Sequence, residues 1–202
     1  IYISLFSSLA TFILSIFVWY SMDFSSSEFQ FLEEQSWINN FINFKLGVDG
    51  ISILFIVLTT LITPICIVSC INSVKDRIKE FLIAILVLET FMIGVFCSLD
   101  LVVFYLFFEA GLIPMFLIIG VWGGPRRVYS AFKFFLFTLL GSVLMLAAII
   151  AIYWITGTTD VTQIYEIKIP KEYQNLLWLA FFSSFAVKMP MWPVHTWLPD
   201  AH

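Results

Sequence analysis

Apolar runs of about 20 residues recur along this chain, and they constrain its fold more than any other feature. A helix of that length crosses the hydrocarbon core of a bilayer. Hydrophobic residues make up 61% of the 202 residues and charged residues 12%, whereas a soluble domain averages about a quarter charged residues. The sequence therefore predicts an all-α fold, a polytopic bundle of transmembrane helices.

Turns and charged stretches divide the chain into about six spans, the last of them broken. Pro190 and Pro193 prevent a regular helix at the end of the last apolar run, because proline cannot donate a helical hydrogen bond. Residues 41–50 alternate and end in Asp49-Gly50, which predicts a short hairpin turning there at the membrane surface. The expected spans are residues 2–20, 48–71, 81–99, 101–122, 131–156 and 175–193.

The charges of the loops predict one orientation in the membrane. Residues 72–80 and 123–133 are rich in lysine and arginine, and such short loops stay on the cytoplasmic or matrix side. The acidic loop at residues 21–46 and the loop at residues 157–174 then face the other side. The chain begins without methionine, and we expect it to be an internal portion of a longer protein.

Several classes of partner and cofactor find no support in the sequence. The net charge is −4 and no basic patch suits nucleic acid. Phosphate-binding, dinucleotide-binding and metal-spaced motifs are absent, so we expect no cofactor, metal or redox centre in this chain. The cysteines are Cys66, Cys70 and Cys97; Cys66 and Cys70 share a helix face, but buried packing is favoured over a disulfide or metal role.

Glu109 stands near the middle of an apolar span and is the leading candidate for function. A charge at the bilayer centre costs about 2.5–3.5 kcal/mol on insertion scales, so it normally faces protein or water. Pro114 cannot donate to the carbonyl of Ala110, which leaves a free oxygen close to the acid. A carboxylate beside an unpaired carbonyl indicates a place where protons or cations rest.

Glu89 occupies the middle of the preceding span and is a weaker candidate. The two spans are joined by a tight turn at Asp100, so Glu89 and Glu109 lie at similar depth, and we expect them on facing sides. Two close acids in a low dielectric do not both ionise easily, which suits proton holding. The alternative is that either acid pairs with a lysine or arginine of another helix for structural reasons.

Lys188 is the cation of the last apolar run and precedes the helix break at Pro190. Unwound backbone at membrane depth is tolerated where it is buried in protein or lines a wet cavity. A buried lysine can give up and regain a proton, and separation from a carboxylate would release it. A static salt bridge or a lysine that reaches the interface remains the alternative.

Three further residues are weaker candidates. His195 and His202 follow Lys188 at helical spacings, but the intervening prolines forbid one continuous helix. Histidine titrates in the range that a proton relay needs, and a hydrogen-bonding role near the interface is equally open. Lys133 begins the fifth span, where it either reaches the interface or takes part in proton transfer.

Several stretches resemble one known family. They are Gly47–Ser52 (GVDGIS), Phe107–Met115 (FFEAGLIPM), Gly120–Arg127 (GVWGGPRR), Phe132–Ser142 (FKFFLFTLLGS) and Ala186–His202 (AVKMPMWPVHTWLPDAH). Together they resemble the antiporter-like proton-pumping subunit of respiratory complex I, which is chain M of the bacterial NADH-quinone oxidoreductase or subunit 4 of the mitochondrial enzyme. The resemblance covers nearly the whole chain, and the last motif is specific for the wider antiporter-like group.

The resemblance implies a 14-helix subunit of which residues 1–202 supply the second to the seventh helices, as a partial proton-translocating domain. It implies that Glu109 and Lys188 are the key acid and lysine, that Glu89 is a second membrane acid and that His195 belongs to a central polar axis. Protons would move through this axis while electrons pass from NADH to quinone elsewhere. NADH, FMN, iron–sulfur clusters and quinone are then expected in other subunits, and the partners are other membrane-arm subunits, the lipid bilayer and protons.

Two other functions stay open at this point. A subunit of a multi-subunit Na⁺/H⁺ antiporter shares the same motifs, and a structural membrane subunit would need only a static Glu109–Lys188 pair. The resemblance implies an energy-transducing membrane, which is the bacterial plasma membrane or, alternatively, the mitochondrial inner membrane. The residues of the Trp-Pro-Val-His and Gly-Gly-Pro-Arg-Arg motifs favour a bacterial source.

Overall fold

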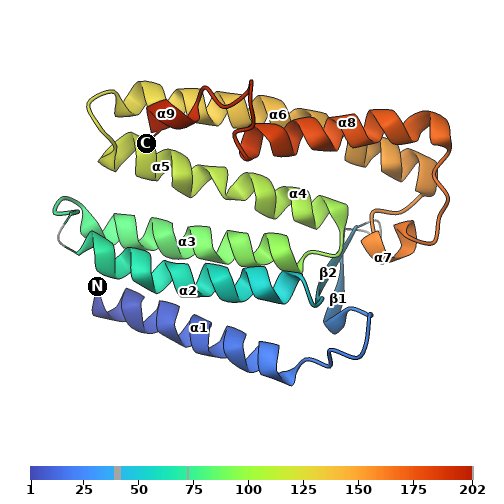
Figure 1. The fold of residues 1–202 in the computed structure, drawn as a ribbon, viewed down its shortest axis with the longest axis horizontal. Helices are drawn as coiled ribbons and strands as arrows, with labels where there is room; N and C mark the ends of the chain where they lie inside the picture. The colour runs from blue at the N-terminus through green and yellow to red at the C-terminus, as the bar shows by residue number, and fades with distance from the viewer. Residues whose placement is uncertain (39–41, 72, 202) are drawn as a thin grey trace.

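The computed structural model describes residues 1–38, 42–71 and 73–201. Long helices lie side by side and run the length of the molecule, with a two-stranded hairpin at one end (Figure 1). The elements are α1 (Tyr2–Ser21), β1 (Gln30–Ile38), β2 (Ile42–Val48), α2 (Ser52–Cys70), α3 (Ile78–Cys97), α4 (Leu101–Ala110), α5 (Leu112–Trp122), α6 (Arg127–Thr156), α7 (Val161–Ile164), α8 (Lys171–Lys188) and α9 (Leu198–Ala201).

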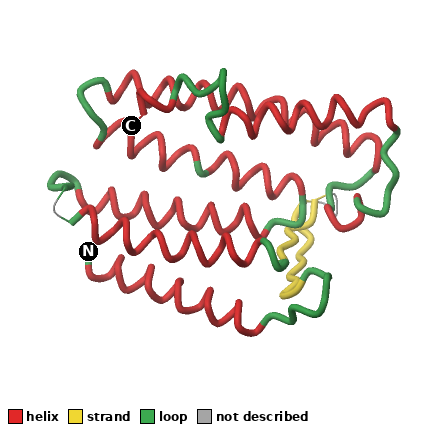
Figure 2. Tube along the Cα trace, in the orientation of Figure 1, coloured by secondary structure: helices red, strands yellow, loops and turns green. Residues whose placement is uncertain are grey.

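Long helices that follow one another in the sequence pack against each other. The helix α1 packs on α2, α2 on α3, α3 on α4 and α5, and α5 on α6, while α8 lies along α6. The tube drawing shows helices almost throughout, with the strands confined to one end (Figure 2). The predicted bundle of transmembrane helices is confirmed.

Five helical segments in the described residues are long and apolar enough to cross a membrane: α1, α2, α3, the segment Leu101–Trp122 and α6. The helix at the expected sixth span, residues 175–193, begins four residues earlier and ends five residues earlier than predicted. Helix α8 begins with Lys171 and Glu172 and ends at Lys188, so it carries three charges in 18 residues. The expected break before Pro190 is present.

Two glycines allow close helix packing beside the candidate residues. A Cβ on Gly94 of α3 would stand 2.6 Å from the Phe107 ring of α4. A Cβ on Gly141 of α6 would stand 2.9 Å from the Val187 side chain of α8. Both distances are shorter than carbon atoms tolerate, so glycine at these positions brings α4 and α8 close to their neighbours.

The two ends of the bundle are built differently. At one end the indole nitrogen of Trp122, the last residue of α5, donates to the Asp76 carbonyl at 2.8 Å, so the two cation-rich loops lie at the same end. At the other end the hairpin and α7 lie together (Figure 1). Following the orientation that the loop charges predict, we call the first end the inner face and the second the outer face.

The expected hairpin forms, but its turn is not at Asp49-Gly50. Strands β1 and β2 pair antiparallel, from Gln30 opposite Val48 to Ile38 opposite Ile42, and the residues that join them lie outside the described part. Asp49 instead precedes α2, where its side chain accepts a hydrogen bond from the Ser52 amide at 2.7 Å. The error has a simple cause, since aspartate and glycine are favoured both in hairpin turns and before helices.

Candidate functional site

Lys188 is the last residue of α8, and its ammonium reaches the helix that carries Glu109. Its Nζ donates to the Phe108 carbonyl at 3.3 Å and stands 4.2 Å from the centre of the Phe108 ring. The Phe185 ring packs edge-on against Phe104 and Phe108, which holds α8 beside α4. The described contacts of the lysine are therefore a backbone oxygen and an aromatic face.

The carbonyl that meets this cation is not the one the sequence indicated. Pro114 has no N–H to donate to the Ala110 carbonyl, and Gly111, with helical φ and ψ of −61° and −20°, separates α4 from α5. Pro114 then lies in the first turn of α5, where a missing N–H is tolerated. The oxygen of Phe108, two residues earlier, accepts from Lys188 instead.

Glu109 lies at the inner end of α4 and interacts electrostatically with Lys188. The two charged groups are not among the ion pairs within 4.0 Å that occur in the described residues. Tyr105 and the buried Ser142 lie beside the carboxylate. Its Oε1 is buried and has no hydrogen-bond partner among the described residues.

Glu89 faces the opposite way, contrary to the expectation that the two acids face each other. It is 5% exposed and lines a cavity of about 290 Å³ between α2 and α3. Ile85, Glu89, Met92 and Phe96 share the side of α3 that faces α2, because they follow the helical period. Gly94 and Phe91 meet α4 instead, so α3 separates Glu89 from Glu109.

His195 lies in the loop that follows the break after α8. The neighbouring Trp197 donates from its indole nitrogen to the Val187 carbonyl at 2.9 Å and folds this loop back on α8. The Nδ1 atom of His195 is buried without a hydrogen-bond partner among the described residues, as is the Ser184 hydroxyl of α8. His202 lies outside the described residues.

Lys133 is engaged away from Glu109. Its Nζ pairs with the Asp200 carboxylate at 2.5 Å, and Arg126 contacts the same carboxylate at 3.1 Å. Both cations hold the pKa of Asp200 below its usual range, chiefly through the hydrogen bond from Lys133. Lys133 thus joins α6 to α9 at the inner face.

The cysteines form no disulfide. Cys66 was expected to be buried, but it lies on an exposed side of α2, and Cys70 and Cys97 are partly exposed. Cys66 lies one helical turn beyond the buried Thr63, at the edge of the buried face, where it lines the same cavity between α2 and α3 as Glu89.

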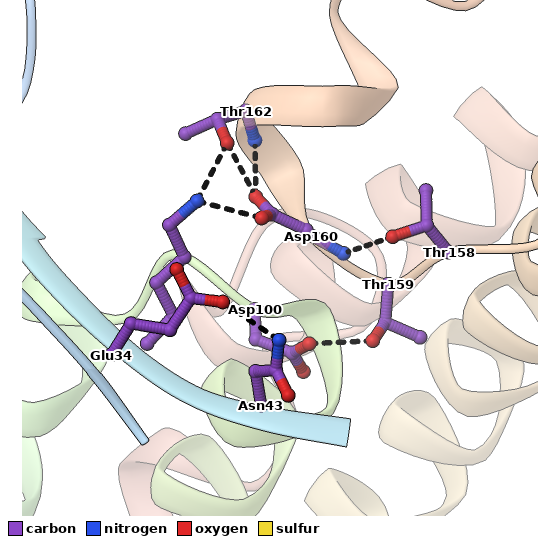
Figure 3. A network of polar contacts seen from close by, with 8 residues as sticks. Glu34, Asn43, Asp100, Thr158, Thr159, Asp160 and Thr162 are labelled. Carbon is purple, nitrogen blue, oxygen red and sulfur yellow. Dashed lines mark hydrogen bonds and ion pairs between the residues drawn. The ribbon is translucent and has the colours of Figure 1, made fainter. Parts of the chain in front are cut away.

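The sequence did not predict a polar cluster that lies at the outer face. Lys45 of β2 donates to Asp160 at 2.6 Å and to the Thr162 hydroxyl at 2.8 Å, while the Thr159 hydroxyl donates to Asp100 (Figure 3). Burial opposes ionisation of Asp160, but hydrogen bonds from Lys45 and Thr162 outweigh it and lower the pKa of that carboxyl. We call Lys45, Asp100, Thr159, Asp160 and Thr162 the outer clasp.

Two family models match consecutive halves of the chain. Residues 1–95 match the amino terminus of NADH-ubiquinone oxidoreductase chain 4, and residues 98–202 match the transmembrane model of the NADH:quinone oxidoreductase/Mrp antiporter family. The chain belongs to this family. The resemblance carried by the motifs around Glu109 and Lys188 is thereby confirmed.

Individual relatives agree with the family assignment. The chain is 54% identical to NADH-quinone oxidoreductase subunit M of Rhodobacter capsulatus over all of its own length and 41% of the relative. It is 51% identical to NADH-ubiquinone oxidoreductase chain 4 of Marchantia polymorpha, over 99% of the chain and 41% of the relative. The chain thus spans about two fifths of the relatives it matches.

A solved structure shows the same fold. A chain of respiratory complex I from Thermus thermophilus with bound NADH superposes with a TM-score of 0.86 at 28% identity, and the match covers 98% of this chain and 42% of that one. The antiporter-like membrane fold is therefore shared, and the chain supplies one portion of it.

Proposed function

We propose that this chain is part of the proton-translocating membrane subunit of an NADH:quinone oxidoreductase. Its membership of the subunit M and chain 4 family supports that assignment. In this role it acts with other membrane-arm subunits in an energy-transducing membrane, bacterial or organellar, since relatives of both kinds match. NADH, FMN, iron–sulfur clusters and quinone would be bound by other subunits, and this chain would hold no redox centre.

The contact between Lys188 and the interrupted helix is the observation that supports proton transfer best. The ammonium rests on the Phe108 carbonyl and ring, with the Glu109 carboxylate close by but beyond 4.0 Å. A static salt bridge would use its best geometry, with direct contact between the charged groups. The observed arrangement instead leaves an unpartnered carboxylate oxygen next to a cation, which suits transfer of protons through intervening water.

The transfer follows from the loss of a countercharge. While Glu109 is ionised and near, it favours the protonated form of Lys188. A conformational or electrostatic signal that weakens this pair removes that support, so the amine releases its proton towards the polar axis that His195 would join. When the pair is restored, the amine regains a proton, and one cycle moves one proton past Lys188.

A cation/proton antiporter subunit is the second candidate, since the family model that matches residues 98–202 also covers Mrp antiporters. Sodium-dependent transport that continues without NADH would favour it. A purely structural subunit would instead tolerate neutral replacement of Glu109.

Replacement of Glu109 by Gln in the full-length parent protein, within its native complex in sealed vesicles, tests the proposal. NADH-driven quinone reduction and proton uptake are recorded together, and assembly is checked on a native gel. Because Gln cannot ionise, we expect both activities to fall by at least about tenfold, since positioned proton transfer contributes roughly 100-fold or more.

The matched control is Glu80→Gln, which removes an acid that is exposed at the inner face and paired with Arg77. Surface pairs of this kind contribute about 0–1 kcal/mol, so activity should stay within about twofold of wild type. If Glu109→Gln assembles and retains both activities, the proposed proton path through Glu109 is wrong.

A further inference from the structure

Two segments that are far apart in sequence, the end of the hairpin and the loop before α7, form backbone hydrogen bonds with the residues at the start of α4. The Leu99 amide donates to the Lys45 carbonyl at 3.0 Å, and the Val161 amide donates to the Leu99 carbonyl at 2.9 Å. The Leu101 amide donates to the Thr159 carbonyl, also at 2.9 Å. Residues 99–101 are therefore held by the backbone between the end of the hairpin and the loop before α7.

Side chains of the outer clasp complete this attachment. Asp100 is 2% exposed, and its Oδ1 accepts from the Val102 and Val103 amides at 2.8 and 3.2 Å, which caps α4. Its other oxygen accepts from the Thr159 hydroxyl (Figure 3). Lys45 links the hairpin to Asp160, at the end of that loop, and to Thr162 of α7.

The clasp and Glu109 lie at the two ends of one short rigid element. Helix α4 has ten residues, begins directly after Asp100 and ends at Ala110. Glu109 is nine residues beyond Asp100, about 14 Å along the axis at 1.5 Å per residue. The cap at Asp100 and the backbone hydrogen bonds of residues 99–101 fix the outer end of this helix.

We propose that the outer clasp is a positioning device for Glu109. Asp100 and Thr159 set the height and rotation of α4, and so determine the separation of the Glu109 carboxylate and the Lys188 ammonium at its far end. Thr159 and Asp100 are positioning residues and do not themselves carry the proton. This inference rests on the proposed function of the Glu109–Lys188 pair.

The test replaces Thr159 by Val in the full-length parent within its native complex, because valine keeps the volume and removes the hydroxyl donor. Thr159→Ser is the matched control, since it keeps the donor. Asp100→Asn is the second variant, and it keeps a capping oxygen while removing the carboxylate charge. Proton uptake and NADH-driven quinone reduction are measured in sealed vesicles from pH 5.5 to 9, with assembly on a native gel.

A positioning role predicts a change in the pH profile as well as in rate. Misplacement on the order of 1 Å can cost up to roughly 100-fold, so we expect a loss of about tenfold in Thr159→Val at full assembly. The groups that titrate around the pair are Glu109, Lys188 and Tyr105. A changed separation of the pair should move the pH of half-maximal uptake by roughly half a unit or more, while Thr159→Ser should match wild type.

The outcomes separate this inference from the proposed function. Loss of rate with an unshifted profile, or failure of both variants to assemble, would mean that the clasp acts in stability alone and would overturn the inference. Glu109→Gln is assayed in parallel. If Glu109→Gln loses proton uptake and quinone reduction while Thr159→Val behaves as wild type, the clasp inference fails and the proposed function stands. If Glu109→Gln keeps both activities, the proposed function itself fails.

Discussion

The outer clasp and the membrane interior around Glu109 and Lys188 differ in whether their buried polar groups have hydrogen-bond partners. In the clasp, the buried carboxylates of Asp100 and Asp160 accept from hydroxyls, amides and the Lys45 ammonium. Farther inside, four buried polar atoms have no hydrogen-bond partner among the described residues. They are Glu89 Oε1, Glu109 Oε1, Ser184 Oγ and His195 Nδ1.

The difference fits the proposed division between residues that hold geometry and residues that exchange protons. A buried polar atom that has no partner at all costs about 1–3 kcal/mol. A fully bonded network resists rearrangement, whereas unpartnered groups can bond to mobile water. Three of the four unpartnered atoms belong to residues that the sequence nominated for proton transfer.

Replacement of Lys188 should have the largest effect on this comparison. Lys188→Met removes the proposed proton carrier, and we expect NADH-driven proton uptake to fall by about tenfold or more. Lys188→Arg keeps the charge but does not deprotonate, so it should fall as far. Proton uptake of the assembled complex in sealed vesicles is the measurement.

Lys171→Met is the matched control for Lys188. Lys171 is exposed at the other end of the same helix, and an exposed substitution usually changes stability by no more than about 0.5 kcal/mol, so proton uptake should stay within about twofold of wild type. Full activity in Lys188→Arg would instead support a static pair and would remove the distinction between the two regions.

Replacement of Lys45 should affect stability rather than proton exchange. Lys45→Met leaves the Asp160 carboxylate buried without its cation, and breaking a buried pair costs about 3–5 kcal/mol. The loss should appear as a lower melting temperature of the solubilised complex. Exposed Lys75→Met, in the inner loop, is the control and should leave the melting temperature unchanged.

The pH dependence of that stability has a definite sign. Hydrogen bonds from Lys45 and Thr162 overcome burial and lower the pKa of Asp160 in the folded state. The clasp therefore stabilises the fold above the unfolded pKa of about 3.9, and this contribution is lost as the pH falls through the lower folded pKa. In Lys45→Met burial is no longer opposed by Lys45, so Asp160 takes up a proton at a higher pH than in wild type. The difference in melting temperature between wild type and Lys45→Met should therefore be largest near pH 8 and shrink as the pH falls towards 5, and a constant difference would contradict the assignment to Asp160.

The sequence predicted the helices, the presence of a hairpin though not the position of its turn, and the break after Lys188, because these features are local. Apolar runs, alternation and proline act over a few residues, and each leaves a pattern that one chain displays. The sequence did not predict the side of α3 that Glu89 faces. That orientation depends on the close approach of Gly94 to Phe107, which is a tertiary contact.

The outer clasp was missed for the same reason. Lys45 and Asp160 are 115 residues apart, and Asp100 and Thr159 are 59 apart. From the sequence, Asp100 is a turn residue and Lys45 is a single cation in an acidic loop, so the sequence did not indicate a side-chain partner for either residue. Likewise, the sequence did not decide the role of Lys133, because its partner Asp200 lies 67 residues away.

The smallest effect should follow replacement of Glu89, and it tests whether the two acids act separately. Glu89 lines a cavity between α2 and α3, on the far side of α3 from Glu109 and Lys188. Sites without shared partners contribute independently, so Glu89→Gln should lower proton uptake by about threefold or less. The double variant Glu89→Gln/Glu109→Asp should then show the product of the two single effects. A departure from that product by more than about threefold would mean that the acids are coupled through α3, and the separation seen in the structure would not hold during transport.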